Sequence, residues 1–139
     1  MTKPAPRKIA VIGDRFMLSS MFEEALRERC KLTTLDIATH DLPWPDEPME
    51  YGYEVQGMDG LKEYMGTADQ VVELTGDAEV LVTHLAPLSP AIMDRLPNLK
   101  FVAVSRGGPV NIDMKAARER GITVVNTPGR NASAVAEFT

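Results

Sequence analysis

The sequence predicts a doubly wound α/β domain of flavodoxin-like type, with a five-stranded parallel sheet and helices on both faces. Short apolar runs alternate with amphipathic stretches along most of the 139 residues. The stretches are long enough to hold crossover helices, which connect parallel strands. Several of the runs end at a glycine or a polar loop, as buried strands do. This length corresponds to one ordinary domain.

The first third of the chain predicts two strands joined by a helix. Residues 8–13 form an apolar run that ends at glycine, and residues 32–36 form a second candidate strand. Between them, Ser19 or Ser20 can cap a helix that runs to about Arg29. Five residues recur at the spacing of one helical face and are expected to point inward: Met21, Phe22, Ala25, Leu26 and Cys30.

The middle of the chain is irregular. Prolines and glycines between residues 40 and 60 break helices and weaken strands, which predicts a surface loop with Trp44 turned inward. A helix is expected between Gly60 and Thr75, and Gly66 could divide it in two. The residues expected to face inward there are Leu61, Tyr64, Met65, Val71, Val72 and Leu74.

The second half of the chain alternates more regularly. Strands are predicted at 80–83, 101–104 and 122–125. Ser89, followed by proline, caps a helix that runs to residue 96, and Asp113 caps one over 114–120. A last helix is expected to begin near Asn131.

Composition excludes several classes of partner. The formal net charge is −5 and no basic run exceeds Arg7-Lys8, so a general nucleic-acid surface is not expected. Cys30 is the single cysteine, which rules out an intramolecular disulfide and suits a reducing compartment. No apolar run approaches the roughly 18 residues of a membrane span, and no signal-peptide pattern is present. A cytoplasmic protein without membrane partners is predicted.

In a doubly wound sheet, ligands bind beyond the carboxyl ends of the strands. The loops to consider are therefore 13–15, 83–87, 105–111 and 126–130. In the third of these, adjacent glycines allow backbone N–H groups to approach an anion, and Arg106 adds a positive charge. The same residues are equally consistent with a tight strand-to-helix turn in which Arg106 is solvated.

No dinucleotide fingerprint of the form G-x-G-x-x-G follows any predicted strand, and no phosphate loop is present. This chain alone is therefore not expected to bind NAD tightly. No metal ligand set is predicted. His40 and His84 are interpreted as ordinary loop or strand-end histidines.

Separated motifs in the second half resemble the D-isomer-specific 2-hydroxyacid dehydrogenases. The resemblance is dense from about residue 77 to 139, and the phosphoglycerate dehydrogenase branch looks nearest. Residues 1–76 fit the family in pattern only. The motifs are Leu-Pro-Asn-Leu-Lys-Phe at 96–101, Ser-Arg-Gly-Gly at 105–108, Asn-Ile-Asp at 111–113, Ala-Ala at 116–117, Arg-Gly-Ile at 120–122, Val-Asn-Thr-Pro-Gly-Arg-Asn at 125–131 and Ala-Val-Ala-Glu at 134–137.

The resemblance implies a two-domain enzyme of which this chain is the substrate-binding part. A Rossmann domain is expected after Thr139; in the family that domain carries the NAD or NADP site, the catalytic arginine, glutamate and histidine, and the usual dimer interface. By this resemblance, the present chain holds no catalytic and no cofactor-binding residue. Its isolated form is expected to be inactive.

The resemblance also assigns residues within this chain. Arg106, Gly107, Gly108 and Val110 match the segment that binds substrate, and Asn126, Thr127 and Pro128 match the crossover into the cofactor domain. The match departs from the family pattern at Pro109, which has no N–H to donate. The expected ligand is a D-2-hydroxyacid or the matching 2-oxoacid, such as 3-phosphoglycerate or a related sugar acid.

Two other functions occur on the same fold. A non-enzymatic corepressor-type module built on the same fold would bind peptides, but no peptide groove can be read from this sequence. A phosphorylation-dependent receiver would need an aspartate where Thr83 and His84 follow the third strand, and a lysine after the fifth. Neither residue stands at its required position in this sequence, so a receiver function is not expected.

Overall fold

A computed structural model describes residues 7–30, 34–43, 50–51 and 61–127. Its main sheet contains the strands Arg7–Gly13 (β1), Leu35–Asp41 (β2), Val80–Thr83 (β5), Phe101–Val104 (β6) and Thr123–Val125 (β7). They pair in parallel in the order β2-β1-β5-β6-β7. This is the doubly wound order of the flavodoxin-like class, so the predicted fold is confirmed. A separate antiparallel pair joins Glu50–Tyr51 (β3) to Lys62–Tyr64 (β4).

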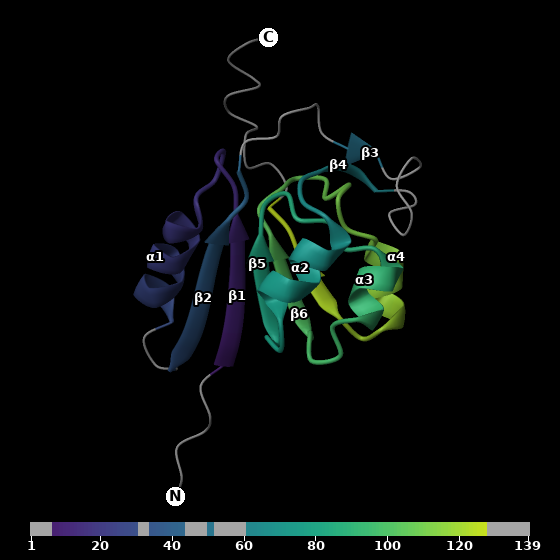
Figure 1. Cartoon of the computed structure of the whole chain (residues 1–139). Coiled ribbons are helices and arrows are strands. Elements are labelled where there is room, and N and C mark those ends of the chain that lie inside the picture. Colours follow the sequence, from purple (N-terminus) through teal and green to yellow (C-terminus); the bar gives the residue numbers. More distant parts are fainter. Residues whose placement is uncertain (1–6, 31–33, 44–49, 52–60, 128–139) are drawn as a thin grey trace, which may run out of the picture.

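Helices cover both faces of the sheet (Figure 1). Helix α1 (Ser19–Arg29) lies against β1 and β2, whereas α2 (Ala68–Thr75), α3 (Pro90–Asp94) and α4 (Met114–Glu119) pack on the opposite face. The division follows from the alternation of side chains along a strand. In β1, Ile9 and Val11 pack with Phe22 and Leu26 of α1, while Ile12 points into the larger core beneath the other helices.

The predictions for the second half of the chain are the most accurate. The strands at 80–83 and 101–104 begin and end at the predicted residues. Ser89 Oγ accepts the Ile92 N–H at 3.2 Å to start α3, and Asp113 Oδ1 accepts the Ala116 N–H at 2.9 Å to start α4. Both caps were expected, because the chain satisfies free N–H groups at a helix start with short polar side chains.

The second strand, predicted at 32–36, ends later than expected, at Asp41; residues 32 and 33 lie outside the described residues. The prediction was wrong because β2 pairs with β1 residue for residue, from Arg7 opposite Leu35 to Gly13 opposite Asp41. This pairing keeps residues 37–41 in the strand, although exposed and half-buried residues alternate along most of it. His40 therefore lies at the end of a strand, which is one of the two placements expected for it.

The capping prediction for α1 was also wrong. The N-cap residue is Leu18, which makes no side-chain cap, and Ser19 is already helical. The inward face is narrower than predicted, since Phe22 and Leu26 pack on the sheet but Met21 is 55% exposed and Ala25 is exposed. Two apolar residues one turn apart are enough to seat this helix at the edge of the sheet.

The helix predicted between Gly60 and Thr75 starts only at Ala68, because β4 occupies residues 62–64. Thr67 and Gln70 form a reciprocal capping box, with Gln70 N donating to Thr67 Oγ1 at 3.1 Å and Thr67 N donating to Gln70 Oε1 at 2.9 Å. The inward residues were predicted correctly: Leu61, Tyr64, Met65 and Val71 are buried, and Val72 and Leu74 partly buried. Trp44 and the helix expected from Asn131 fall outside the described residues.

An exposed ion pair fastens α3 to α4. Arg120 donates to the Asp94 carboxylate at 2.8 Å, and this contact holds the pKa of Asp94 below its ordinary value of 3.8. A carboxyl group whose pKa is lowered by folding stabilises the fold above its unfolded pKa, and that stabilisation is lost as the pH falls through the folded pKa.

We therefore predict that Asp94→Asn lowers the free energy of unfolding slightly at neutral pH, and that the difference from the original chain disappears in acid below 3.8. Urea unfolding at a series of pH values measures this difference. A difference that persists unchanged in acid would show that the pair does not contribute through its charge.

Candidate functional site

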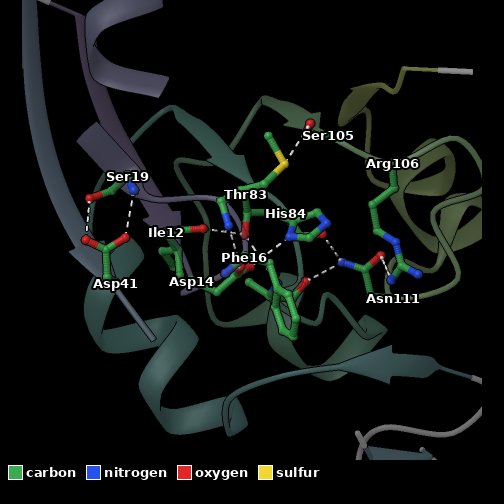
Figure 2. A network of polar contacts seen from close by, with 12 residues as sticks. Ile12, Asp14, Phe16, Ser19, Asp41, Thr83, His84, Ser105, Arg106 and Asn111 are labelled. Atoms are coloured by element: carbon green, nitrogen blue, oxygen red, sulfur yellow. Dashed lines mark hydrogen bonds and ion pairs between the residues drawn. The ribbon is translucent and has the colours of Figure 1, made fainter. Parts of the chain in front are cut away.

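The carboxyl ends of the parallel strands bring together segments that lie far apart in the sequence. Asp14 follows β1, His84 follows β5 and Ser105 follows β6. Strands β1 and β5 are neighbours although β2 is formed between them in sequence, so the strand order reverses at this point. Ligands of doubly wound folds bind at such a reversal. Figure 2 shows the polar side chains that gather here.

The loop after β1 is fixed to the end of β2. Asp41 Oδ1 accepts the Ser19 N–H at 2.6 Å, and its Oδ2 accepts the Ser19 hydroxyl at 2.9 Å. Gly13 lies beside this contact, where a Cβ atom would come within 2.4 Å of Ser19 N and 2.7 Å of Asp41 Oδ1. Only glycine allows the helix start to approach the sheet so closely.

Asp14 is fully buried. Its Oδ1 accepts the backbone N–H groups of Phe16 at 2.8 Å and Met17 at 2.9 Å, and its Oδ2 lies 2.9 Å from Nδ1 of His84. A buried carboxylate is costly unless such partners surround it. Asp14 therefore shapes the first loop and also holds the His84 ring from the side (Figure 2).

The loop after β5 is held by two further buried polar side chains. Thr83 Oγ1 donates to the Ile12 carbonyl at 2.8 Å and accepts the Ala86 N–H at 3.2 Å. Asn111, which is also fully buried, donates through Nδ2 to the carbonyls of Ala86 at 2.8 Å and His84 at 3.3 Å. These bonds fix the backbone on both sides of His84.

Arg106 crosses from the segment after β6 to β4. Its Nη2 donates to the Glu63 carboxylate at 2.7 Å and its Nη1 to the Glu63 carbonyl at 3.0 Å, while Nη1 also contacts Asn111 Oδ1 at 3.3 Å. Glu63 adopts a left-handed backbone conformation, with φ of 52°, to present both acceptors. The guanidinium group is thus partly engaged by the protein itself.

Residues 105–111, which we call the glycine loop, expose unused backbone donors. Within the described residues, the N–H groups of Arg106, Gly107 and Gly108 donate to no other group. The carbonyls behind them are occupied, since Thr127 N donates to Arg106 O at 3.0 Å and Asn126 Nδ2 donates to Gly107 O at 2.8 Å. Successive free N–H groups of this kind form a concave site for an anion.

The described residues among those predicted for the site all lie at the carboxyl edge of the sheet, but they differ in exposure and hydrogen bonding. Gly107 and Gly108 are exposed. The N–H of Val110 donates to Gly108 O at 2.8 Å, so only its 40% exposed side chain remains available for a ligand. Asn126 and Thr127 contact the glycine loop, and Pro128 lies outside the described residues.

The sequence analysis missed the polar groups that support this loop. Thr83, Asn111 and the Asp14–His84 contact were not singled out as partners, and His84 was interpreted as an ordinary strand-end histidine. A usable signal existed, because Asp14 and His84 each follow directly after strands that are neighbours in the usual order of the predicted flavodoxin-like class.

The first loop does not fit a dinucleotide. A pyrophosphate would need free N–H groups in the loop after β1 and at the start of α1. The Asp14 carboxylate already accepts those of Phe16 and Met17 in the loop, Asp41 accepts that of Ser19 at the helix start, and the Asp14 charge would repel the anion. Among the residues described, no three His, Cys, Asp or Glu side chains come together as metal ligands. No helix in the same ranges is long and apolar enough to cross a membrane.

The parallel order β2-β1-β5-β6-β7 defines a doubly wound α/β domain, and sequence comparison identifies its family. Residues 46–139 match the family described as D-isomer specific 2-hydroxyacid dehydrogenase, catalytic domain. The chain belongs to this family. Its structure also resembles NAD⁺-bound 3-phosphoglycerate dehydrogenase of Entamoeba histolytica, with a TM-score of 0.65 and 20% identity over 96% of this chain and 37% of that one.

Two curated relatives share more sequence. The hydroxypyruvate reductase of Thermotoga maritima is 40% identical over 71 residues, which are 50% of this chain and 23% of that protein. The glycerate dehydrogenase of Methylorubrum extorquens is 31% identical over 93 residues, which are 67% of this chain and 26% of that protein. The matched part of the chain is thus about a quarter of the length of these relatives.

Alanine substitutions at two glycines of this edge are predicted to affect stability to very different degrees. Gly13→Ala is expected to lower the free energy of unfolding by about 2 kcal/mol or more, because the added methyl group collides with backbone. Gly108→Ala is expected to change it by less than about 0.5 kcal/mol, because a Cβ there meets nothing within 4 Å. Chemical unfolding of both variants compares them, and equal losses would contradict the packing described.

Proposed function

We propose that this chain binds the carboxylate of a D-2-hydroxyacid or 2-oxoacid in the glycine loop, as the substrate-binding part of an NAD- or NADP-dependent dehydrogenase. The observation that carries the proposal is the row of N–H groups on Arg106, Gly107 and Gly108, which have no acceptor in the described part of the chain. Carboxylate oxygens are strong acceptors for such groups. Membership of the family supplies the reaction class.

The substrate we propose carries an oxygen atom at C3. The names of the two curated relatives, a hydroxypyruvate reductase and a glycerate dehydrogenase, both refer to three-carbon acids of this type. 3-Phosphoglycerate and related sugar acids belong to the same group. The exposed side chain of Val110 is proposed to contact the ligand beside the loop.

The remaining parts of the enzyme are proposed to lie in a dinucleotide-binding domain after Thr139. The bound nicotinamide supplies hydride exchange at C2. Asn126, Thr127 and Pro128 would form the crossover into that domain, and the parent protein would dimerise through it. The described residues of this chain bind and orient the acid and contribute no group to the proton or hydride transfer. The 139 residues alone are therefore expected to give no turnover.

The proposal predicts where a ligand binds. Titration of the ¹⁵N-labelled chain with D-glycerate is expected to shift the amide signals of Arg106, Gly107 and Gly108 most. Gly108→Ala should weaken binding about fivefold or more, since its methyl group hinders the approach of the carboxylate while the fold has room for it. Shifts confined to other loops, or equal affinity of the variant, would contradict the assignment.

Arg106 is proposed to add a positive charge to the site, in competition with its internal partner. The Glu63 carboxylate, half-exposed, already lies 2.7 Å from Nη2. Glu63→Gln removes a negative charge that competes with the ligand, so the affinity for D-glycerate is expected to rise about threefold to tenfold. Isothermal titration measures this, with Glu119→Gln on exposed α4 as a control that should change nothing. An unchanged affinity for Glu63→Gln would limit Arg106 to a structural role.

A further inference from the structure

We propose that His84 recognises the C3 hydroxyl group of the substrate and that Asp14 positions its ring for this purpose. The proposal rests on the proposed function, because it concerns the end of the acid that the glycine loop does not hold. It makes the chain selective for acids of the glycerate type over those that carry a plain methyl group, such as lactate.

The Asp14 contact determines which nitrogen of His84 carries hydrogen. Oδ1 of Asp14 accepts two backbone N–H groups, which is the pattern of an ionised carboxylate. Its Oδ2 therefore also acts as an acceptor, and Nδ1 of His84, 2.9 Å away, donates to it. In the neutral ring the lone pair is then on Nε2, which can accept a hydrogen bond.

Nε2 is the one polar atom of the His84 side chain that the protein leaves available. It has no partner among the described residues, and it is not buried, so it faces solvent through the 12% of the side chain that is exposed. The ring cannot turn freely, because Asp14 holds Nδ1 and Asn111 holds the backbone carbonyl. A fixed acceptor that points outward from a buried support is suited to ligand recognition.

The position of His84 relative to the glycine loop fits a three-carbon acid. Thr83 pairs with Val104 across β5 and β6, and Ser105 N donates to Thr83 O at 2.9 Å, so the segments that begin with His84 and Ser105 leave the sheet from neighbouring strands. Asn111 links the two segments, since it bonds to the His84 carbonyl and to Arg106 (Figure 2). A carboxylate bound at Arg106 and Gly107 therefore places the rest of a small acid near Nε2.

The chemistry of the reaction selects C3 as the group that faces His84. Hydride exchange occurs at C2, so C2 must face the nicotinamide. The loop after β1 does not fit a dinucleotide, so we place the nicotinamide on the side of the acid that faces away from the described residues. The C3 end is then free to lie over this chain. A C3 hydroxyl can donate to Nε2, whereas the methyl group of lactate cannot, and a phosphate group at that position would offer only acceptors.

The test compares D-glycerate with D-lactate, which differ by the C3 hydroxyl alone. Heteronuclear NMR titration of the chain should show glycerate binding about fivefold more tightly. His84→Asn keeps an N–H near the position of Nδ1 but has no counterpart of Nε2, so the affinity ratio should fall close to one. His40→Asn, the same change at the exposed histidine of β2, should preserve the ratio.

A second measurement tests the role of Asp14. Imidazole ¹⁵N shifts should show hydrogen on Nδ1 of His84 in the original chain. In Asp14→Asn, the amide donates to Nδ1, so the hydrogen should move to Nε2 and the affinity ratio should fall. If the Asp14–His84 pair had only a structural role, the His84 tautomer and the glycerate-to-lactate affinity ratio would not change together.

The outcomes separate this inference from the proposed function. If Gly108→Ala weakens both ligands but His84→Asn leaves the ratio unchanged, or reduces both affinities equally, the role of His84 is overturned and the glycine loop stands. If neither acid binds, or binding ignores Gly108→Ala, the proposed function fails and this inference fails with it.

Discussion

The buried carboxylate of Asp14 is the group on which the geometry of the candidate site depends. With no solvent exposure, it must find all of its hydrogen-bond donors within the protein. It takes them from the first loop, through Phe16 and Met17, and from the end of β5, through His84. Strands β1 and β5 are thus joined at their carboxyl ends as well as by their backbone ladder. Loss of any of these donors would leave a buried charge incompletely paired.

Asn111 extends the same principle toward the glycine loop. Its amide satisfies the carbonyls of His84 and Ala86 on one side and accepts from Arg106 on the other. A buried amide with donors and acceptors both used specifies one relative position of the two loops. The N–H groups of Arg106 to Gly108, which we propose bind the carboxylate, are therefore held in a fixed position relative to His84 by the Asn111 side chain.

Structural features were predictable from the sequence where they depend on neighbouring residues, and were missed where they depend on distant ones. Ser89 and Asp113 were recognised as helix caps because capping involves only the next three residues. The position of β2 could not be recognised, since pairing with β1 and not local hydrophobicity keeps residues 37–41 in the strand. For the same reason Ser19 was taken for a cap, whereas its donors are used by Asp41, 22 positions later.

The site shows the same division, and its glycines show how structure resolves what sequence leaves open. The glycine loop was predicted from its place after a strand, its residues and the family resemblance, but its unused N–H donors could be recognised only from the hydrogen bonds of the described residues. Gly13 is required by packing, because no space exists for a side chain. Gly108 has open space around it, and none of the described hydrogen bonds uses its N–H, so neither packing nor the described bonds call for glycine there. The proposed approach of a ligand to the backbone would explain glycine at position 108. The two glycines thus contrast a position fixed by packing with one that the proposed binding explains.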